Sequence, residues 1–280
     1  MFLDFLFKNK KKNSNIDVKQ TLSSANKISN NNKLENERIA VRKGELGEYK
    51  IDIQLSQMPK EYMYLSDLLI KNPRSATGYS QIDHVIITPY GFFVIETKNY
   101  QGTIYGGKNR KTWLINGKFK MMNPLRQNYS HIQALKNFIE DKYHPHFISM
   151  ISFTRRCTLN VGEELREINS NELVIYDIKF TEFINRKMAL LKLQYKEPIL
   201  TEVEIKRIYD SILNSNITDP SIRKQHVDSI QRKKINNKKI DNENKCVVCQ
   251  KLVSDKVKSY CLSNKKYGGK IYCFEHQKTV

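Results

Sequence analysis

The chain has 280 residues, enough for one sizeable domain and a small additional module. Its 48 Lys and Arg residues outnumber 29 Asp and Glu, and the formal net charge of +19 favours a polyanionic partner such as nucleic acid. The many Lys, Asn and Ile residues also fit an A/T-rich coding bias, which leaves part of this charge without functional meaning. No apolar run reaches the length of a transmembrane helix, so the composition predicts a soluble protein.

The first 36 residues are predicted to form a flexible basic leader. Residues 2–7 are mostly apolar and lysines follow at 8–12, which is the reverse of the order in a secretory signal. Residues 9–36 are rich in Asn, Ser and Lys and show little apolar periodicity. Contact of residues 2–12 with an anionic membrane surface stays open as an alternative.

Residues 37–216 show the mixture of helix and strand signals of an α/β domain. Apolar spacing predicts a helix at 44–55, and a run of apolar residues predicts a strand at 63–70. The later elements expected in chain order are a hairpin at 81–98, a turn-rich stretch around Gly102, Gly106 and Gly107, a strand carrying Trp113 and Ile115, a long helix at 124–143, strands at 148–153 and 173–178, and an amphipathic helix at 203–213.

The hairpin at 81–98 carries the strongest functional signal. Its turn at 88–91 has Pro second and Gly fourth and separates two runs of β-branched and aromatic residues. Counting outward from that turn pairs Asp83 with Glu96, and Gln81 with Lys98. The period of two then places these four side chains on one face, with the carboxylates roughly 5 Å apart.

Two carboxylates placed in this way need compensation, because like charges directly opposite one another destabilise a sheet. The intervening positions are apolar, so both faces are expected to be buried, and buried carboxylates are rarely left unpaired. A divalent cation between Asp83 and Glu96, with Lys98 beside it, compensates the charge and prepares a phosphate for attack. An exposed hairpin without chemistry is the alternative interpretation.

The order of these elements resembles the PD-(D/E)XK nuclease core and is similar, more narrowly, to the nuclease-related domain (NERD) of bacterial proteins. The resemblance covers about residues 41–138 and rests on four separate motifs in the right order. The matching residues are Gly44, Glu45, Gly47 and Glu48, then Gln81 to His84, then Gly91, Val94 to Tyr100 and Gly102, then Trp113, and finally Asn123 to Leu125, Gln127, Asn128 and His131.

The resemblance implies roles that agree with the chemistry of these side chains. Asp83 and Glu96, with the backbone carbonyl of Thr97, would hold Mg²⁺ or Mn²⁺, because hard cations take oxygen ligands. Glu48 on the first helix would join the metal shell directly or through water. Lys98 would lower the pKa of the attacking water or stabilise negative charge on the phosphate.

The family pattern also directs a second helix toward the site. Gln127 and His131 lie four residues apart on the helix predicted at 124–143, hence on one face. The resemblance implies that both point toward the site. A surface or packing role is the alternative for this pair.

The chain after residue 216 divides into a linker and a module. Residues 217–245 are mainly Arg, Lys, Asn and Gln and are predicted to form a basic linker, part of it helical. Residues 246–280 hold four of the five cysteines. The fifth, Cys157, stands alone and is expected to be a small buried side chain.

The C-terminal cysteines have the spacing of a zinc site. Cys246 with Cys249, and Cys273 with His276, form two ligand pairs at a two-residue spacing that predicts tetrahedral Zn²⁺. The segments 257–260 and 267–272 resemble the zinc-ribbon modules of DNA-processing proteins, in which the position of Cys261 is not a ligand. A reactive cysteine cluster is the alternative. Metal binding by thiols favours a reducing cytoplasm.

The sequence therefore predicts an α/β restriction-endonuclease-like core with a mixed central sheet flanked by helices, a basic linker and a small zinc-binding module. The predicted function is a Mg²⁺- or Mn²⁺-dependent DNA endonuclease or nickase in DNA processing or defence. RNA as a substrate stays open, and so does a protein partner for the zinc module. A nucleic-acid-binding protein that keeps the nuclease fold without turnover is the alternative function.

Overall fold

The computed structural model describes residues 35, 39 and 42–280. Within residues 234–243 only the backbone is described. The expected basic leader at 1–36 and its membrane-facing segment lie outside the described residues, apart from residue 35. Among the helices that are described, none combines the length and the apolar character needed to cross a bilayer.

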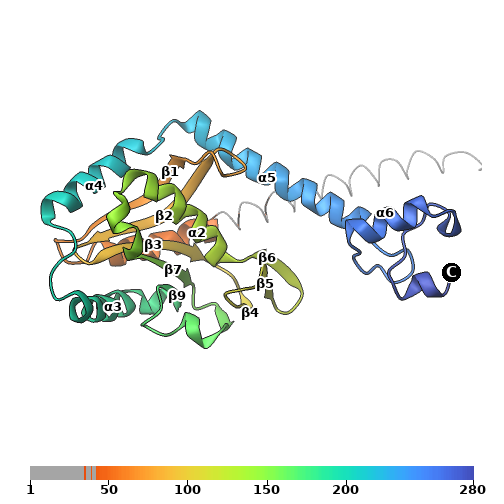
Figure 1. Ribbon diagram of the computed structural model, residues 1–280, viewed down its shortest axis with the longest axis horizontal. Coiled ribbons are helices and arrows are strands. Elements are labelled where there is room, and N and C mark those ends of the chain that lie inside the picture. Colours follow the sequence, from red (N-terminus) through yellow and green to blue (C-terminus); the bar gives the residue numbers. More distant parts are fainter. Residues whose placement is uncertain (1–34, 36–38, 40–41) are drawn as a thin grey trace, which may run out of the picture.

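A mixed five-stranded sheet forms the centre of the domain, in the strand order β1-β2-β3-β7-β9 (Figure 1). The first three strands are antiparallel, whereas β3, β7 and β9 run parallel to one another. The prediction of a mixed sheet flanked by helices is confirmed. The strands are β1 Met63–Lys71, β2 Tyr79–Thr88, β3 Gly91–Lys98, β7 Phe147–Phe153 and β9 Glu172–Tyr176.

Helices cover both faces of this sheet, and each pair buries its own apolar cluster. On one face α2 (Pro124–Leu135) and α4 (Glu202–Ser215) pack against the strands. On the other face the helix at 42–55 and α3 (Phe180–Tyr195) do the same. The parallel strands are consequently apolar on both sides, as expected for a sheet between two helical layers.

A second, smaller sheet with the order β6-β5-β4-β8 lies beyond the end of β3. Trp113 of this sheet stacks on Phe153 of β7, with ring centroids 6.2 Å apart and planes only 8° from parallel. Cys157 is buried there, as predicted, and burial raises the pKa of its thiol to about 11. The strands are β4 Gly102–Tyr105, β5 Thr112–Ile115, β6 Phe119–Met122 and β8 Cys157–Asn160.

The predicted basic linker is a single helix, α5 (Pro220–Glu243), which leads from the α/β core to the C-terminal module (Figure 1). Its first half is tied to the β1–β2 hairpin. Arg223 binds the Asp67 carboxylate at 2.7 Å, and Lys233 Nζ donates to the Ala76 carbonyl at 2.6 Å. The module beyond it contains α6 (Asp255–Ser263).

Two element boundaries differ from the prediction. The helix expected at 124–143 ends at Leu135, because the chain tightens into a 3-10 turn at Lys136–Phe138 and Ile139 is then extended, with φ of −131° and ψ of 135°. His144 Nε2 lies 3.2 Å from the Lys136 carbonyl and 2.9 Å from the Ile139 carbonyl. The strand expected at 173–178 ends at Tyr176, because the Asp177 carboxylate accepts from the backbone N–H of Ile178 and starts a turn. The helix α3 was not predicted.

Candidate active site and metal centre

The β2 and β3 strands separate where the charged residues begin. Their register pairs Thr88 with Gly91 and continues to His84 with Ile95, as counted from the turn. The expected Asp83–Glu96 pair is not part of this ladder. Instead, Asp83 Oδ2 accepts hydrogen bonds from both the backbone N–H and the hydroxyl of Thr97, each at 2.7 Å. The Asp83 carboxylate therefore lies beside β3 and is fixed by it.

Asp67 on β1 explains why the strict alternation of faces fails here. Its φ of 49° is left-handed, and the β1–β2 ladder omits the pair between Ser66–His84 and Leu68–Ile82. Gln81 also turns away, donating to Asp67 at 3.1 Å. The expectation that Gln81 lies beside Lys98 on β3 is therefore wrong. The break in alternation at Asp67 directs the Gln81 side chain toward β1 instead.

Gln127 takes the place beside Lys98 that the register gave to Gln81. Lys98 Nζ donates to Glu96 Oε1 and to Gln127 Oε1, the latter at 3.2 Å. Gln127 Nε2 in turn donates to Glu96 Oε1 at 2.6 Å. His131, one turn further along α2, has Nε2 3.2 Å from Glu96 Oε2 without the alignment of a hydrogen bond. The structure thus brings Gln127 and His131 to the predicted site residues Glu96 and Lys98.

Glu48 completes the group of carboxylates from the opposite helical layer. Burial, followed by repulsion from Asp83, raises its pKa from 4.5 to about 7. Burial and the charge of Glu96 likewise raise the pKa of Asp83. Burial opposes ionisation of Glu96 too, but Lys98 and His131 outweigh burial and hold its pKa below the ordinary value. Lys98 therefore balances the negative charge of Glu96, whereas the negative charges of Asp83 and Glu48 are not balanced by a nearby cation.

The sequence interpretation missed the residues that fix the first helix. Asp52 lies four residues after Glu48, on the same helix face, and accepts a hydrogen bond from Ser66 Oγ at 2.5 Å. His84 Nδ1 lies 3.0 Å from Ser66 Oγ and 3.4 Å from Asp52 Oδ1. This contact joins the helix to β1 and β2 and so positions Glu48. The i, i+4 spacing of two carboxylates was the available signal.

Two asparagines fix α2 in the same way. Asn128 is fully buried and donates to the Val94 carbonyl and to Ser149 Oγ, both at 2.8 Å. Asn123 caps the N-terminus by accepting from the Leu125 N–H at 2.9 Å. The helix is therefore held against β3 and β7, and Gln127 next to Asn128 has a defined position. Both asparagines belong to the motif that carried the family resemblance.

The donor set of this site fits a hard divalent cation. Glu96 Oε2 is buried without a hydrogen bond, and the hydrogen bonds to Asp83 all reach its other oxygen, Oδ2. With Glu48, three carboxylates from two strands and one helix offer oxygen ligands and excess negative charge, which is what Mg²⁺ or Mn²⁺ requires. The Thr97 carbonyl stays a predicted ligand.

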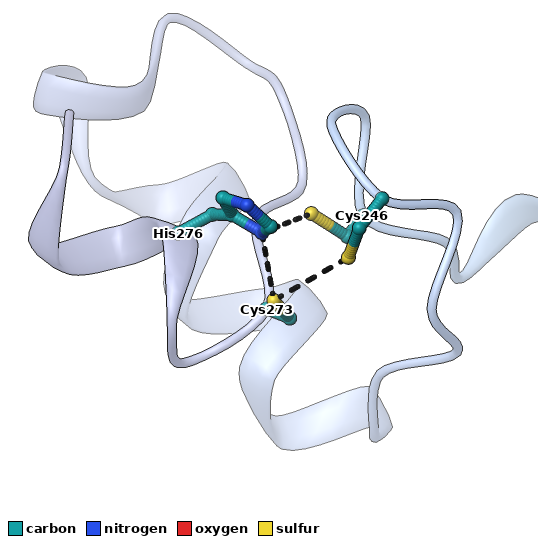
Figure 2. Close-up of side chains that lie close together, drawn as sticks. Cys246, Cys273 and His276 are labelled. Atoms are coloured by element: carbon teal, nitrogen blue, oxygen red, sulfur yellow. Dashed lines mark hydrogen bonds between the residues drawn. The ribbon is translucent and has the colours of Figure 1, made fainter.

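A second group of ligand-type side chains lies in the C-terminal module (Figure 2). The four ligand atoms of Cys246, Cys249, Cys273 and His276 lie within 4.8 Å of one another. Cys249 Sγ is 3.7 Å from Cys273 Sγ, and His276 Nδ1 is 3.1 Å from Cys273 Sγ and 3.6 Å from Cys246 Sγ. These atoms are too far apart for disulfides, and about 3.7 Å is the edge of a tetrahedron with Zn–S bonds of 2.3 Å.

The polypeptide around this cluster lowers the pKa of Cys246 and Cys273, whereas at Cys249 a backbone hydrogen bond is outweighed by burial and these two neighbouring thiols, which raise the pKa. Burial raises the pKa of Cys246, but the backbone N–H groups of Cys249, Cys273 and Val248 outweigh burial and bring it to about 6. Cys261 stands outside the cluster, as predicted. Its buried sulfur accepts from the Tyr272 N–H at 3.5 Å.

Comparison with known proteins places these observations in a family. The family model described as "nuclease-related domain" matches residues 43–154, which include Glu48, Asp83, Glu96, Lys98 and Gln127. An uncharacterized protein of Bacillus anthracis is 34% identical over 195 residues, covering 68% of this chain and 85% of the relative. The chain belongs to the nuclease-related domain family. No solved structure matches it. In this NERD protein, α5 and the Cys/His cluster lie outside the residues matched by the family model.

Proposed function

We propose that this NERD protein is a metal-dependent nuclease that hydrolyses phosphodiester bonds of DNA, in DNA processing or defence. One observation carries the proposal: Lys98 binds Glu96 on β3, Thr97 between them holds the Asp83 carboxylate, and the charges of Glu48 and Asp83 are not balanced by the protein. The family match to a nuclease-related domain supports it. Perturbed carboxylates of this kind gather at catalytic sites.

Glu48, Asp83 and Glu96, with the Thr97 carbonyl, would hold Mg²⁺ or Mn²⁺ in this proposal. When bound, such a cation polarises the scissile phosphate and lowers the pKa of a water ligand. Thr97 keeps the Asp83 carboxylate in place through its N–H and hydroxyl. The chain thus supplies a site whose geometry is set before substrate arrives.

Lys98 would stabilise negative charge on the phosphate. Glu96 and Asp83 raise the pKa of its ammonium against the effect of burial, so Lys98 stays charged. Gln127 accepts from Lys98 and donates to Glu96, which orients both groups. His131 contributes a positive or polar group beside Glu96.

The C-terminal module would hold one structural Zn²⁺ through Cys246, Cys249, Cys273 and His276. The donor set of three sulfurs and one imidazole is that of structural zinc sites, and the spacing of the ligand atoms supports it. Metal binding by reduced thiols favours a cytoplasmic location in this proposal. With α5, the module would form a basic attachment that binds nucleic acid or a protein partner.

The test is cleavage by the purified full-length protein. Single-stranded, duplex and branched DNA and RNA are incubated with Mg²⁺, with Mn²⁺ and without added divalent cation, using the parent and Glu96→Gln. Cleavage that needs a divalent cation and is lost in Glu96→Gln supports the assignment. Binding of nucleic acid without cleavage under every condition would favour the alternative, a nucleic-acid-binding protein with a nuclease fold.

A further inference from the structure

The β5–β6 hairpin and the segments beside it form an acid-free part of the chain next to the candidate active site. From residue 97 to residue 139 there is no Asp or Glu, whereas this stretch has eight Lys and Arg residues. Lys108 is bound by Glu172 at 2.6 Å. Within the part of the chain that the structure describes, no ion pair occupies the exposed Arg110, Lys111, Lys118, Lys120 and Arg126.

The end of this hairpin carries an exposed aromatic ring whose two neighbours in sequence are exposed lysines. Asn116 and Gly117 form its turn with φ values of 52° and 69°, the left-handed pair of a type I′ turn. Phe119 follows at the start of β6 and is 66% exposed, with exposed Lys118 and Lys120 on either side. An exposed phenylalanine at a basic position is a surface on which a base can stack while the lysines meet phosphates.

The hairpin is held rigidly. The Asn116 side chain accepts from the Thr103 N–H, and its backbone N–H donates to the Thr103 carbonyl, both at 2.8 Å. Gly102, with a φ of 98°, gives room for this contact, because a Cβ there would collide with the Asn116 amide. The oxygen of the only side-chain amide in residues 112–122 is thereby bound to the backbone of β4.

Two contacts join the hairpin to the candidate active site. Trp113 on β5 stacks on Phe153, whose backbone pairs with Lys98. At the other end, β6 runs directly into Asn123, whose side chain also donates to the Arg110 carbonyl at 2.7 Å, and α2 then carries Gln127 one turn later. The hairpin is therefore connected to the elements that carry Lys98 and Gln127, so a nucleic-acid strand bound to it can extend toward the carboxylate site.

We propose that the β5–β6 hairpin binds single-stranded nucleic acid beside the site of cleavage, with Phe119 stacked on an unpaired base and Lys118 and Lys120 on the neighbouring phosphates. The inference rests on the proposed nuclease function and adds its substrate class, a strand that is unpaired near the reacting phosphate. Stacking and charge explain the binding without base-edge contacts, so it depends little on sequence.

The experiment measures binding of the full-length protein to single-stranded oligonucleotides, without added divalent cation, with 2-aminopurine at successive positions and the matched duplex as comparison. Phe119→Leu keeps an apolar side chain opposite Ile115 but removes the aromatic face. It should weaken single-strand binding about tenfold and abolish quenching of 2-aminopurine. Phe119→Trp should keep both. An RNA oligonucleotide of the same sequence shows whether the 2′-hydroxyl groups change the affinity.

Charge is tested separately. Lys118→Ala with Lys120→Ala should lower the salt slope of log Kd on single strands by about 1.4, or about 0.7 for each phosphate contact. The matched controls are exposed residues near the other end of the sheet, Leu193→Ala for the apolar change and Lys60→Ala with Lys192→Ala for the charges.

Unchanged quenching in Phe119→Leu, or an equal loss on single strands and duplex, would overturn the inference, the second result indicating a duplex-binding hairpin. The two proposals fail differently. If Phe119→Leu loses quenching but the parent protein never cleaves nucleic acid, the hairpin assignment is supported and the nuclease function is rejected. If the parent shows metal-dependent cleavage but every hairpin variant binds and quenches like the parent, the nuclease function is supported and the hairpin assignment is rejected.

Discussion

The α/β core and the C-terminal module place ligand-type side chains together by different physical means. In the core, apolar clusters on both faces of the sheet fix the strands, and Asp83 and Glu96 are carried into position by a fold that exists without them. In the module, the apolar cluster is small: Cys261, Tyr267 and Tyr272 with Val257. Segments of fewer than about 40 residues usually need a metal or a disulfide to fold.

This difference predicts opposite consequences for the two sites. Removing a carboxylate from the core should remove chemistry and leave the core folded, because the apolar clusters on both faces of the sheet hold the strands in place. Removing a thiol from the module should remove the fold of that module and leave the core. The following changes test this contrast, from the largest effect to the smallest.

Asp83→Asn and Glu96→Gln should each reduce divalent-cation-dependent cleavage by about a thousandfold or more, because each removes an anionic oxygen from the proposed ligand set. The thermal midpoint should stay the same or rise in Asp83→Asn, because the folded-state pKa of Asp83 is raised. It should fall in Glu96→Gln, because this change leaves the buried Lys98 ammonium without its carboxylate partner. Cleavage rate and calorimetry measure the two halves. Asp210→Asn, an exposed acid on α4, is the charge-matched control. Parent-like cleavage in either site variant would move the active site elsewhere.

Cys249→Ser and Cys273→Ser should release zinc and unfold residues 246–280, because a tetrahedral site needs all four ligands. Zinc content by metal analysis and limited proteolysis of the module follow the change, and the core should keep its melting transition. Cys261→Ser is the control and should retain zinc. Zinc that persists in Cys249→Ser but is lost in Cys261→Ser would identify a different ligand set.

Gln127→Ala should lower cleavage about tenfold, since it frees Lys98 and Glu96 from their shared partner without removing charge. His131→Ala should have a similar or smaller effect. Single-turnover rates measure both. Gln133→Ala on the same helix is the control and should match the parent. If Gln127→Ala and His131→Ala equal the parent at every pH, α2 plays no part in the reaction.

Glu48 should make the stability of the core depend on pH. Its folded pKa of about 7 exceeds the ordinary 4.5, so between these pH values the folded state keeps a proton that the unfolded state loses. Stability without divalent cation therefore falls as pH rises through that window. Glu48→Gln should show less of this fall, so its thermal midpoint should exceed that of the parent above pH 7 and approach it below pH 4.5. Parallel profiles would contradict the raised pKa.

The sequence by itself determined the parts of this protein that depend on local patterns. Alternation and turn chemistry gave the β2–β3 hairpin and its register from Thr88–Gly91 to His84–Ile95. The two-residue spacing of cysteines and histidine gave a cluster whose ligand atoms lie within 4.8 Å of one another. Four motifs in the right order predicted the nuclease-related domain family, because each motif is defined by residue types at short, fixed spacings in the sequence.

Only the tertiary structure decided which side chains meet at the carboxylate site. The left-handed backbone at Asp67 broke the alternation that would have placed Gln81 beside Lys98, and α2 brought Gln127 there from 29 residues away. The twist of neighbouring strands and the packing of a helix on them are set by the whole sheet. The alternation of residues along one strand predicts neither the twist of the sheet nor the position of a helix packed on it.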